Sequence, residues 1–140
     1  MDLERALILA VLAAMVPALV LSGRRLAGRS FERTRGTSGD PLWASLGTAP
    51  DGRPTVVAFS TPGCTACWTA QKPALAALLQ RARNGVRVIE VDAAEQPQVA
   101  RTFGVLTVPA TVVLDQSGGI LAANQGFATT DRLAAQLGLK

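Results

Sequence analysis

Short runs of β-branched residues alternate with helical patterns in the C-terminal part of this chain. The first run, PTVVAFS at residues 54–60, lies between Gly52 and Pro62 and predicts a buried strand. The same criteria predict strands at 85–92, 110–115 and 119–124 and helices at 64–83, 97–103 and 129–137. This order of elements predicts an α/β fold, with a mixed central sheet of parallel and antiparallel pairs flanked by helices on both faces.

The only two cysteines of the chain, Cys64 and Cys67, lie where the first predicted strand passes into its helix. A spacing of three residues on a helix places both sulfurs on one side, close enough to form a disulfide. The free amides and the dipole at the start of a helix favour a thiolate at Cys64, and the thiolate is the reactive form. These residues predict a redox dithiol in which Cys64 attacks a substrate disulfide and Cys67 releases the product.

Other roles for the two cysteines remain open at this point. Free cysteines are often core residues, although the exposed junction after Pro62 and Gly63 disfavours that role. A structural zinc site needs four ligands, and two cysteines without any histidine do not supply them. Two thiolates could instead hold Cu(I). The lack of histidine also excludes a hydrolase that uses a Cys–His pair.

An apolar segment near the N-terminus sets a second constraint. Residues 6–23 carry no charge, and eighteen such residues are about the minimum for a bilayer span. We expect residues 1–23 to form an N-terminal transmembrane helix that anchors the chain in membrane lipid. A signal peptide cleaved after Ser22 remains an alternative. A soluble core helix is disfavoured, because such helices are rarely apolar all round.

The residues that follow the apolar segment are basic and predict the topology. The arginines between residues 24 and 35, against Glu32 alone, are Arg24, Arg25, Arg29, Arg33 and Arg35. Basic flanks stay in the cytoplasm, so we expect a single-pass protein whose C-terminal domain faces the cytoplasm, with the extracytoplasmic face as the alternative. Residues 24–53, rich in Gly, Ser, Thr, Pro and Arg, are interpreted as a basic juxtamembrane linker.

Charge and size exclude some classes of protein. The net charge of +4 comes mostly from the basic flank, because residues 41–140 carry eight Lys or Arg against six Asp or Glu. A near-neutral domain without basic clusters or aromatic platforms is not expected to bind nucleic acid. A domain of roughly 100 residues can bury its own core, so it does not need a disulfide to fold, and we expect it to be monomeric.

The sequence TPGCTACW after PTVVAFS, followed by GVRVIEVDAAEQPQVARTFGVLTVPATVVLD, resembles the thioredoxin family from about Pro54 to the C-terminus. The resemblance implies a thioredoxin-like fold over residues 54–140. It also implies that Cys64 and Cys67 are the catalytic pair and that Pro109 follows a cis peptide bond beside it. Val108 would pair its backbone with an extended substrate segment, and Gly126 would line the same groove.

Several positions depart from the family pattern. The aromatic residue that usually precedes the first cysteine is replaced by Gly63. The buried acid of typical thioredoxins would fall at Ala58, and its companion lysine at Val88. Pro73 stands one residue further from Cys67 than the pattern has it. The disulfide chemistry survives these changes, whereas the redox potential and the direction of flux do not carry over.

The sequence therefore predicts a membrane-anchored thiol-disulfide oxidoreductase that acts on disulfide-containing protein substrates. It needs a reductant or redox partner that the sequence does not identify, and no cofactor or metal is expected. The alternative hypothesis is a membrane-tethered binding module without catalysis, in which the same groove holds a protein partner or Cu(I).

Overall fold

A computed structural model describes residues 3–4, 6–8, 10–17 and 40–140 of the chain. The chain forms two compact units, Met1–Arg33 and Thr34–Lys140.

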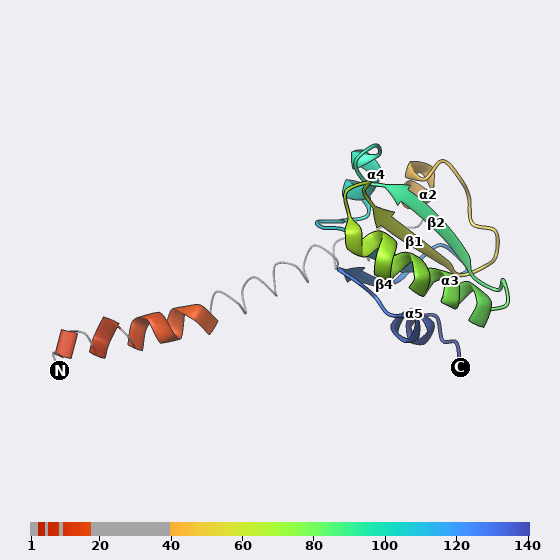
Figure 1. The fold of residues 1–140 in the computed structure, drawn as a ribbon. Helices are drawn as coiled ribbons and strands as arrows, with labels where there is room; N and C mark the ends of the chain where they lie inside the picture. The colour runs from red at the N-terminus through yellow and green to blue at the C-terminus, as the bar shows by residue number, and fades with distance from the viewer. Residues whose placement is uncertain (1–2, 5, 9, 18–39) are drawn as a thin grey trace. The chain divides into compact units, whose positions relative to one another are not determined.

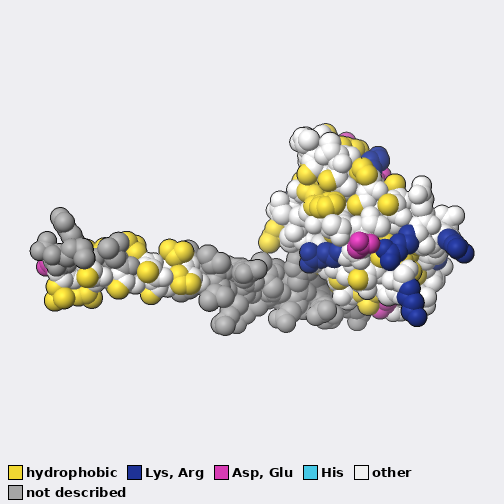
Figure 2. All heavy atoms as spheres, turned by 60° about the horizontal axis from the view of Figure 1, so that its bottom comes forward, with side chains coloured by type: hydrophobic (Ala, Val, Ile, Leu, Met, Phe, Trp, Pro, Cys, Tyr) yellow, Lys and Arg dark blue, Asp and Glu magenta, His cyan; other side chains and the backbone are white. Residues whose placement is uncertain are grey.

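The described residues between 3 and 17 are helical, and Figure 2 shows apolar side chains along them. Leu7, Val11 and Met15 are among those exposed. None of the described helices has the length and apolar character that crossing a membrane requires. The predicted span at 6–23 lies partly outside the described residues, as does the predicted linker at 24–53.

The second unit is built on a four-stranded sheet (Figure 1). The strands are β1 (Thr55–Ser60), β2 (Arg87–Asp92), β3 (Ala110–Leu114) and β4 (Ile120–Gln125), and their order across the sheet is β2-β1-β3-β4. β1 pairs in parallel with β2 and antiparallel with β3, and β3 pairs antiparallel with β4. The predicted mixed sheet is therefore confirmed.

Helices cover both faces of this sheet. They are α2 (Asp40–Ser45), the π-helix η1 (Cys67–Gln71), α3 (Lys72–Arg81), α4 (Pro97–Thr102) and α5 (Thr130–Gln136). α3 and α5 pack against each other, as do α2 and α4. The succession predicted from the sequence is confirmed, with η1 and α3 together replacing one continuous α-helix.

Two apolar clusters separate the sheet from its helices, because alternate residues of a strand point to opposite faces. Val57 and Phe59 of β1 pack with residues of α2 and α4, and the Phe59 and Phe103 ring centroids lie 5.5 Å apart. Val56 and Ala58 of β1 pack on the other face with residues of α3 and α5. The second cluster supports the helix that carries the cysteines.

The segment before β1 takes part in the first cluster. Leu42 and Trp43 of α2 are buried there, although residues 40–53 were assigned to the linker. Arg87 of β2 donates to the carbonyl oxygen of Ala49 at 3.0 Å and to the hydroxyl of Thr48 at 3.0 Å. Residues 40–53 are thus tied to the sheet over much of their length.

Candidate active site

Cys64 and Cys67 form a disulfide at the C-terminal end of β1. Their Cα atoms are 5.3 Å apart, as the three-residue spacing on a helix predicts. Pro62 and Gly63 form the turn between strand and helix, which the Cys64 N–H closes by donating to the Thr61 carbonyl oxygen at 3.1 Å. The strand end and the helix start therefore hold both sulfurs beyond the C-terminal end of β1, an inner strand of the sheet.

The two cysteines differ in exposure and in hydrogen bonding. Cys64 is half-buried, whereas only 4% of Cys67 is exposed. The backbone N–H of Cys67 points at Cys64 Sγ, with nitrogen and sulfur 3.1 Å apart. An amide donor at the start of a helix favours negative charge on a nearby sulfur, and Cys64 is also the more accessible of the two cysteines.

A π-turn follows the second cysteine. Its closing hydrogen bond runs from the Lys72 N–H to the Cys67 carbonyl oxygen, five residues back, so this turn holds one residue more than an α-helical turn. The extra residue accounts for Pro73, which lies one position further from Cys67 than the resemblance implies. α3 begins at Lys72 and keeps its apolar residues on the core.

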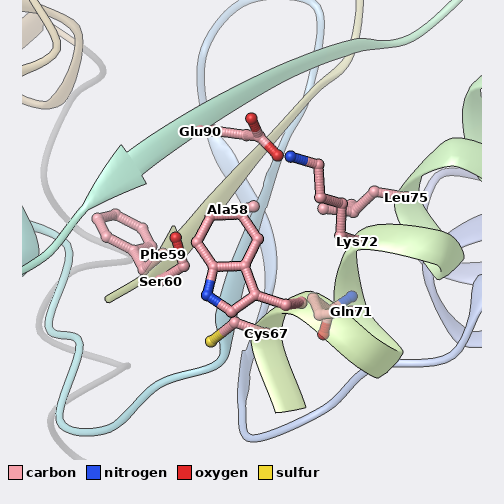
Figure 3. Close-up of a pocket in the computed structure, with 9 residues that line it drawn as sticks. Ala58, Phe59, Ser60, Cys67, Gln71, Lys72, Leu75 and Glu90 are labelled. Carbon is pink, nitrogen blue, oxygen red and sulfur yellow. The ribbon is translucent and has the colours of Figure 1, made fainter. Parts of the chain in front are cut away.

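A cavity of about 20 Å³, roughly the size of one water molecule, lies beside Cys67. Its lining includes Ala58, Ser60, Lys72 and Glu90. Figure 3 shows Glu90 of β2 and Lys72 of α3 pointing toward one another. Ala58 and Val88 stand where the family pattern has a buried acid and a lysine. Two other charged side chains, those of Glu90 and Lys72, reach this cavity instead.

The Val108–Pro109 peptide bond is cis, as the resemblance implies. The Pro109 carbonyl oxygen accepts from the Gly126 N–H at 2.8 Å, which brings two of the predicted site residues together. Gly126 has φ +90°, and a Cβ there would meet no atom within 4 Å, so the backbone conformation rather than lack of space favours glycine.

Gln71 joins the cysteine helix to the Gly126 segment. Its Nε2 donates to the Ala128 carbonyl oxygen at 3.1 Å, and its Oε1 accepts from the Ala128 N–H at 3.0 Å. This residue was not predicted from the sequence. The available signal was a polar side chain at helical spacing between Cys67 and Leu75, on the face that packs against the sheet.

A second glutamine holds the loop before Pro109. Gln125 Oε1 accepts from the backbone N–H groups of Leu106 and Thr107 at 3.2 and 3.4 Å. Its Nε2 donates to the Gly104 carbonyl oxygen at 2.9 Å. Both loops of the site are therefore held by side-chain amides in addition to backbone hydrogen bonds.

Apolar side chains are exposed on the three segments that carry these residues. Trp68 follows Cys67 and is 48% exposed, Leu106 precedes Val108 and is 68% exposed, and Phe127 follows Gly126 and is 46% exposed. The Trp68 indole N–H donates to the Pro62 carbonyl oxygen at 3.3 Å, and the Lys72 Nζ lies 4.9 Å from the Trp68 ring centroid. Exposed apolar groups of this kind suit contact with another polypeptide.

Clusters of three or more His, Cys, Asp or Glu side chains that could hold a metal ion are absent from the described residues. On the face of the second unit shown in Figure 2, basic side chains are spaced apart with an acidic side chain between two of them.

Residues 48–138 match the family model for thioredoxin. Among solved structures, a Fasciola hepatica thioredoxin is similar at 22% identity and a TM-score of 0.55, covering 71% of this chain and 88% of that one. Chloroplastic thioredoxin z is similar at 18% identity and a TM-score of 0.58, covering 73% and 88%. Thioredoxin-2 of a malaria parasite is similar at 24% identity and a TM-score of 0.57, covering 61% and 82%. At these identities the structures bear on the fold alone.

Proposed function

The chain belongs to the thioredoxin family, and on that premise we propose that it is a thiol-disulfide oxidoreductase that reduces or exchanges disulfides in protein substrates. The observation that carries the proposal is the asymmetry of the cysteine pair. Cys64 is the more exposed of the two, and its sulfur receives the Cys67 N–H at the start of the helix. Cys64 then has the properties of an attacking thiolate, and Cys67 those of a resolving thiol.

The reaction takes two steps from the reduced pair. The Cys64 thiolate attacks one sulfur of a substrate disulfide, which forms a mixed disulfide and expels the other substrate sulfur as a thiolate. Cys67 then loses its proton and attacks Cys64 Sγ, which re-forms the Cys64–Cys67 disulfide and expels the second substrate thiolate. The substrate gains two electrons and the cysteine pair loses two. A separate dithiol reductant must return them before the next cycle.

Deprotonation of Cys67 is the step that the local structure must assist, because burial disfavours a thiolate. The cavity beside Cys67 has room for one water molecule and is also lined by Glu90 and Lys72. In this proposal a water in that cavity passes the Cys67 proton to the Glu90 carboxylate, and the nearby Lys72 ammonium favours negative charge on the sulfur.

The proposed location is a membrane, with residues 6–23 as the anchor and the thioredoxin domain on the cytoplasmic side. The exposed apolar side chains among residues 3–17 and the basic residues from Arg24 to Arg35 support this. A cytoplasmic domain would mainly reduce disulfides, because the compartment keeps thiols reduced. In intact cells a membrane-impermeant maleimide should then leave Cys64 unmodified, and modification before permeabilisation would place the domain outside.

The function is tested by reduction of insulin with the full chain and dithiothreitol. Cys64→Ser should abolish turnover, and Cys67→Ser should stop the reaction at a mixed disulfide. Ala66→Ser, which changes an exposed residue between the two cysteines, is the matched control and should keep its activity. Normal turnover in both cysteine variants would exclude the redox cycle. A partner that still binds to a Cys64→Ser chain without turnover would favour a binding module.

A further inference from the structure

Gln71 is a buried side chain that links segments far apart in the sequence. Only 3% of it is exposed, and both ends of its amide bond to the backbone of Ala128, 57 residues later. Ala128 is itself fully buried, so its N–H and carbonyl groups depend on this side chain for hydrogen bonds. The Gln71 amide therefore bonds to the segment after β4 as the backbone of a neighbouring strand would, with one donated and one accepted hydrogen bond.

The other end of the link is the cysteine pair. Cys67 and Gln71 are the two buried residues of η1, and they are its first and last residues. Gln71 also lines the cavity beside Cys67. A displacement of η1 would therefore move the resolving sulfur and the Gln71 amide together.

The two residues immediately before Ala128 border the site. Phe127 exposes its ring, and the Gly126 N–H donates to the Pro109 carbonyl oxygen at 2.8 Å. A continuous series of bonds thus runs from Cys67 through Gln71 and Ala128 to Gly126 and Pro109. Each member after Gln71 is a backbone group, and Gly126 is also held by the β3–β4 ladder, in which Gln125 pairs with Ala110.

We propose that Gln71 is a positioning residue, which sets the Gly126–Ala128 segment at the distance from the cysteine pair that a polypeptide substrate requires. The inference rests on the proposed oxidoreductase function and adds a specificity determinant to it. Gln71 touches neither sulfur by hydrogen bond, so its effect falls on the binding of polypeptide disulfides and not on the exchange chemistry.

A purely structural role is the competing explanation, and the chain offers a matched control for it. Gln136 of α5 also joins a helix to β4 by side-chain amide bonds, donating to Asn124 Oδ1 at 2.9 Å and accepting from Asn124 Nδ2 at 3.0 Å. Its partner Asn124 precedes Gln125 and has no bond to the Gly126–Ala128 segment in the described part of the chain. Loss of either glutamine amide should cost stability, but only Gln71 should affect substrate binding.

The test compares Gln71→Met and Gln136→Met in the full chain on two substrates, insulin and the small aromatic disulfide 5,5′-dithiobis(2-nitrobenzoic acid). For Gln71→Met we expect the KM for insulin to rise by about tenfold, with kcat and the rate on the small disulfide within about twofold of the original chain. Gln136→Met should leave both substrates within about twofold. If Gln71→Met does not fold, Gln71→Glu keeps the acceptor for the Ala128 N–H but loses the donor to the Ala128 carbonyl oxygen, and it should raise the KM for insulin in the same direction.

Two results would overturn the inference while leaving the oxidoreductase function in place. One is an equal loss on both substrates in the Gln71 variants, and the other is an unchanged KM for insulin. If the unmodified chain reduces neither disulfide, the oxidoreductase function fails and the inference fails with it.

Discussion

The backbone N–H of Lys72 donates to the carbonyl oxygen of Cys67, five residues earlier in the chain. An α-helix would make this bond over four residues, so one residue is accommodated as a local widening of the helix. The widening places the cysteine pair and α3 in their positions without rotating the apolar face of α3 away from the sheet. One residue can therefore be removed within η1 without changing the register of α3.

Deletion of Thr69 should therefore be tolerated. The exposed Thr69 lies inside η1, and without it the same Lys72-to-Cys67 bond would span four residues as in an α-helix. We expect the free energy of unfolding to change by less than about 1.5 kcal/mol. Urea unfolding followed by circular dichroism measures this.

Deletion of Ala77 is the matched control for Thr69. Ala77 is also exposed, but it lies within α3, between the buried residues Leu75 and Leu78. Its removal turns the two parts of the helix by about 100° relative to each other, so one of the leucines must leave the core. A loss above about 4 kcal/mol is expected. Equal effects of the two deletions would contradict the register argument.

Gly118 and Trp43 should be energetically coupled. Gly118 has φ +92°, and a Cβ there would overlap Trp43 Nε1 and lie 2.9 Å from Trp43 Cδ1. Gly118→Ala should lower the free energy of unfolding by about 2–4 kcal/mol, through the strained backbone and the overlap. In a double-mutant cycle, Trp43→Phe should recover about 1 kcal/mol or more of this, because it removes the atom that is overlapped.

Gly47 separates the two causes of that loss. It has φ +66°, and a Cβ there would meet no atom within 4 Å, so Gly47→Ala adds backbone strain alone. We expect a loss of about 1 kcal/mol that Trp43→Phe does not alter. Trp43→Phe by itself should cost about 1–2 kcal/mol through the smaller ring in the first cluster, with no loss of a hydrogen bond, because the buried Nε1 lacks a partner among the described residues. Additive losses at Gly118 and Trp43 would mean that the ring moves away freely.

The turn between β3 and β4 should make stability depend on pH. The Ser117 hydroxyl and the Gly119 N–H donate to Asp115 and hold the pKa of its carboxyl below the ordinary value of 3.8. The pKa is lower in the folded state, so the stabilisation is complete above the unfolded value and is lost as the pH falls through the folded value. Asp115→Asn should cost about 1 kcal/mol at pH 7 and almost nothing at the acid end of the titration, as measured by urea unfolding at each pH.

Asp131 provides the control for Asp115. It forms an ion pair with Arg81 at 2.9 Å, but its side chain is 93% exposed. Exposed ion pairs contribute little to stability. At every pH, the unfolding free energy of Asp131→Asn should therefore be close to that of the original chain. A pH-independent difference between the original chain and Asp115→Asn would show that the turn is stabilised by shape and not by charge.

The cavity beside Cys67 leads to a prediction about rate. Glu90→Gln removes the proposed proton acceptor while keeping the size of the side chain, so release of the mixed disulfide should slow by about tenfold near pH 6. The first attack by Cys64 should not change. Rapid-quench detection of the mixed disulfide separates the two steps. Glu95→Gln, which changes an exposed residue elsewhere in the chain, is the control. An unchanged release rate in Glu90→Gln would show that Glu90 does not accept the proton.

Local sequence patterns predicted the helices and strands well where a buried strand or an amphipathic helix has a clear hydrophobic pattern. β1 and β3 are fully or almost fully buried, and their β-branched runs identified them with only small shifts of their ends. β2 begins at Arg87 and not at 85, because Arg83 and Asn84 adopt left-handed conformations and extend the turn. The cysteine pair and the cis bond before Pro109 were predicted from residue spacing and from the family resemblance.

Features that depend on distant partners could not be predicted in this way. α2 has six residues, too few for a periodic pattern, and it is held by its packing on α4 and the sheet. Gln71 looks like any polar helix residue until Ala128, 57 residues away, supplies its partner. The π-turn left one trace in the sequence, the extra residue between Cys67 and Pro73 relative to the family pattern, but the pattern alone did not show where the helix takes up that residue.

The Cys64–Cys67 disulfide should have only a modest effect on folding. It closes a loop of three to four residues, and in the chain-entropy account such a loop contributes about 2 kcal/mol. The two apolar clusters on either side of the sheet do not include the disulfide, so the reduced chain should fold to the same structure. In the reduced state the Cys67 N–H would also stabilise a Cys64 thiolate, which makes the difference in stability between the oxidised and reduced chains smaller still. Urea unfolding should therefore give one cooperative transition without dithiothreitol and one with it. The free energies of unfolding of the two forms should differ by no more than about 2 kcal/mol. A reduced chain that is unfolded without urea would identify the cysteine pair as a structural cross-link, because an oxidoreductase must remain folded in both redox states.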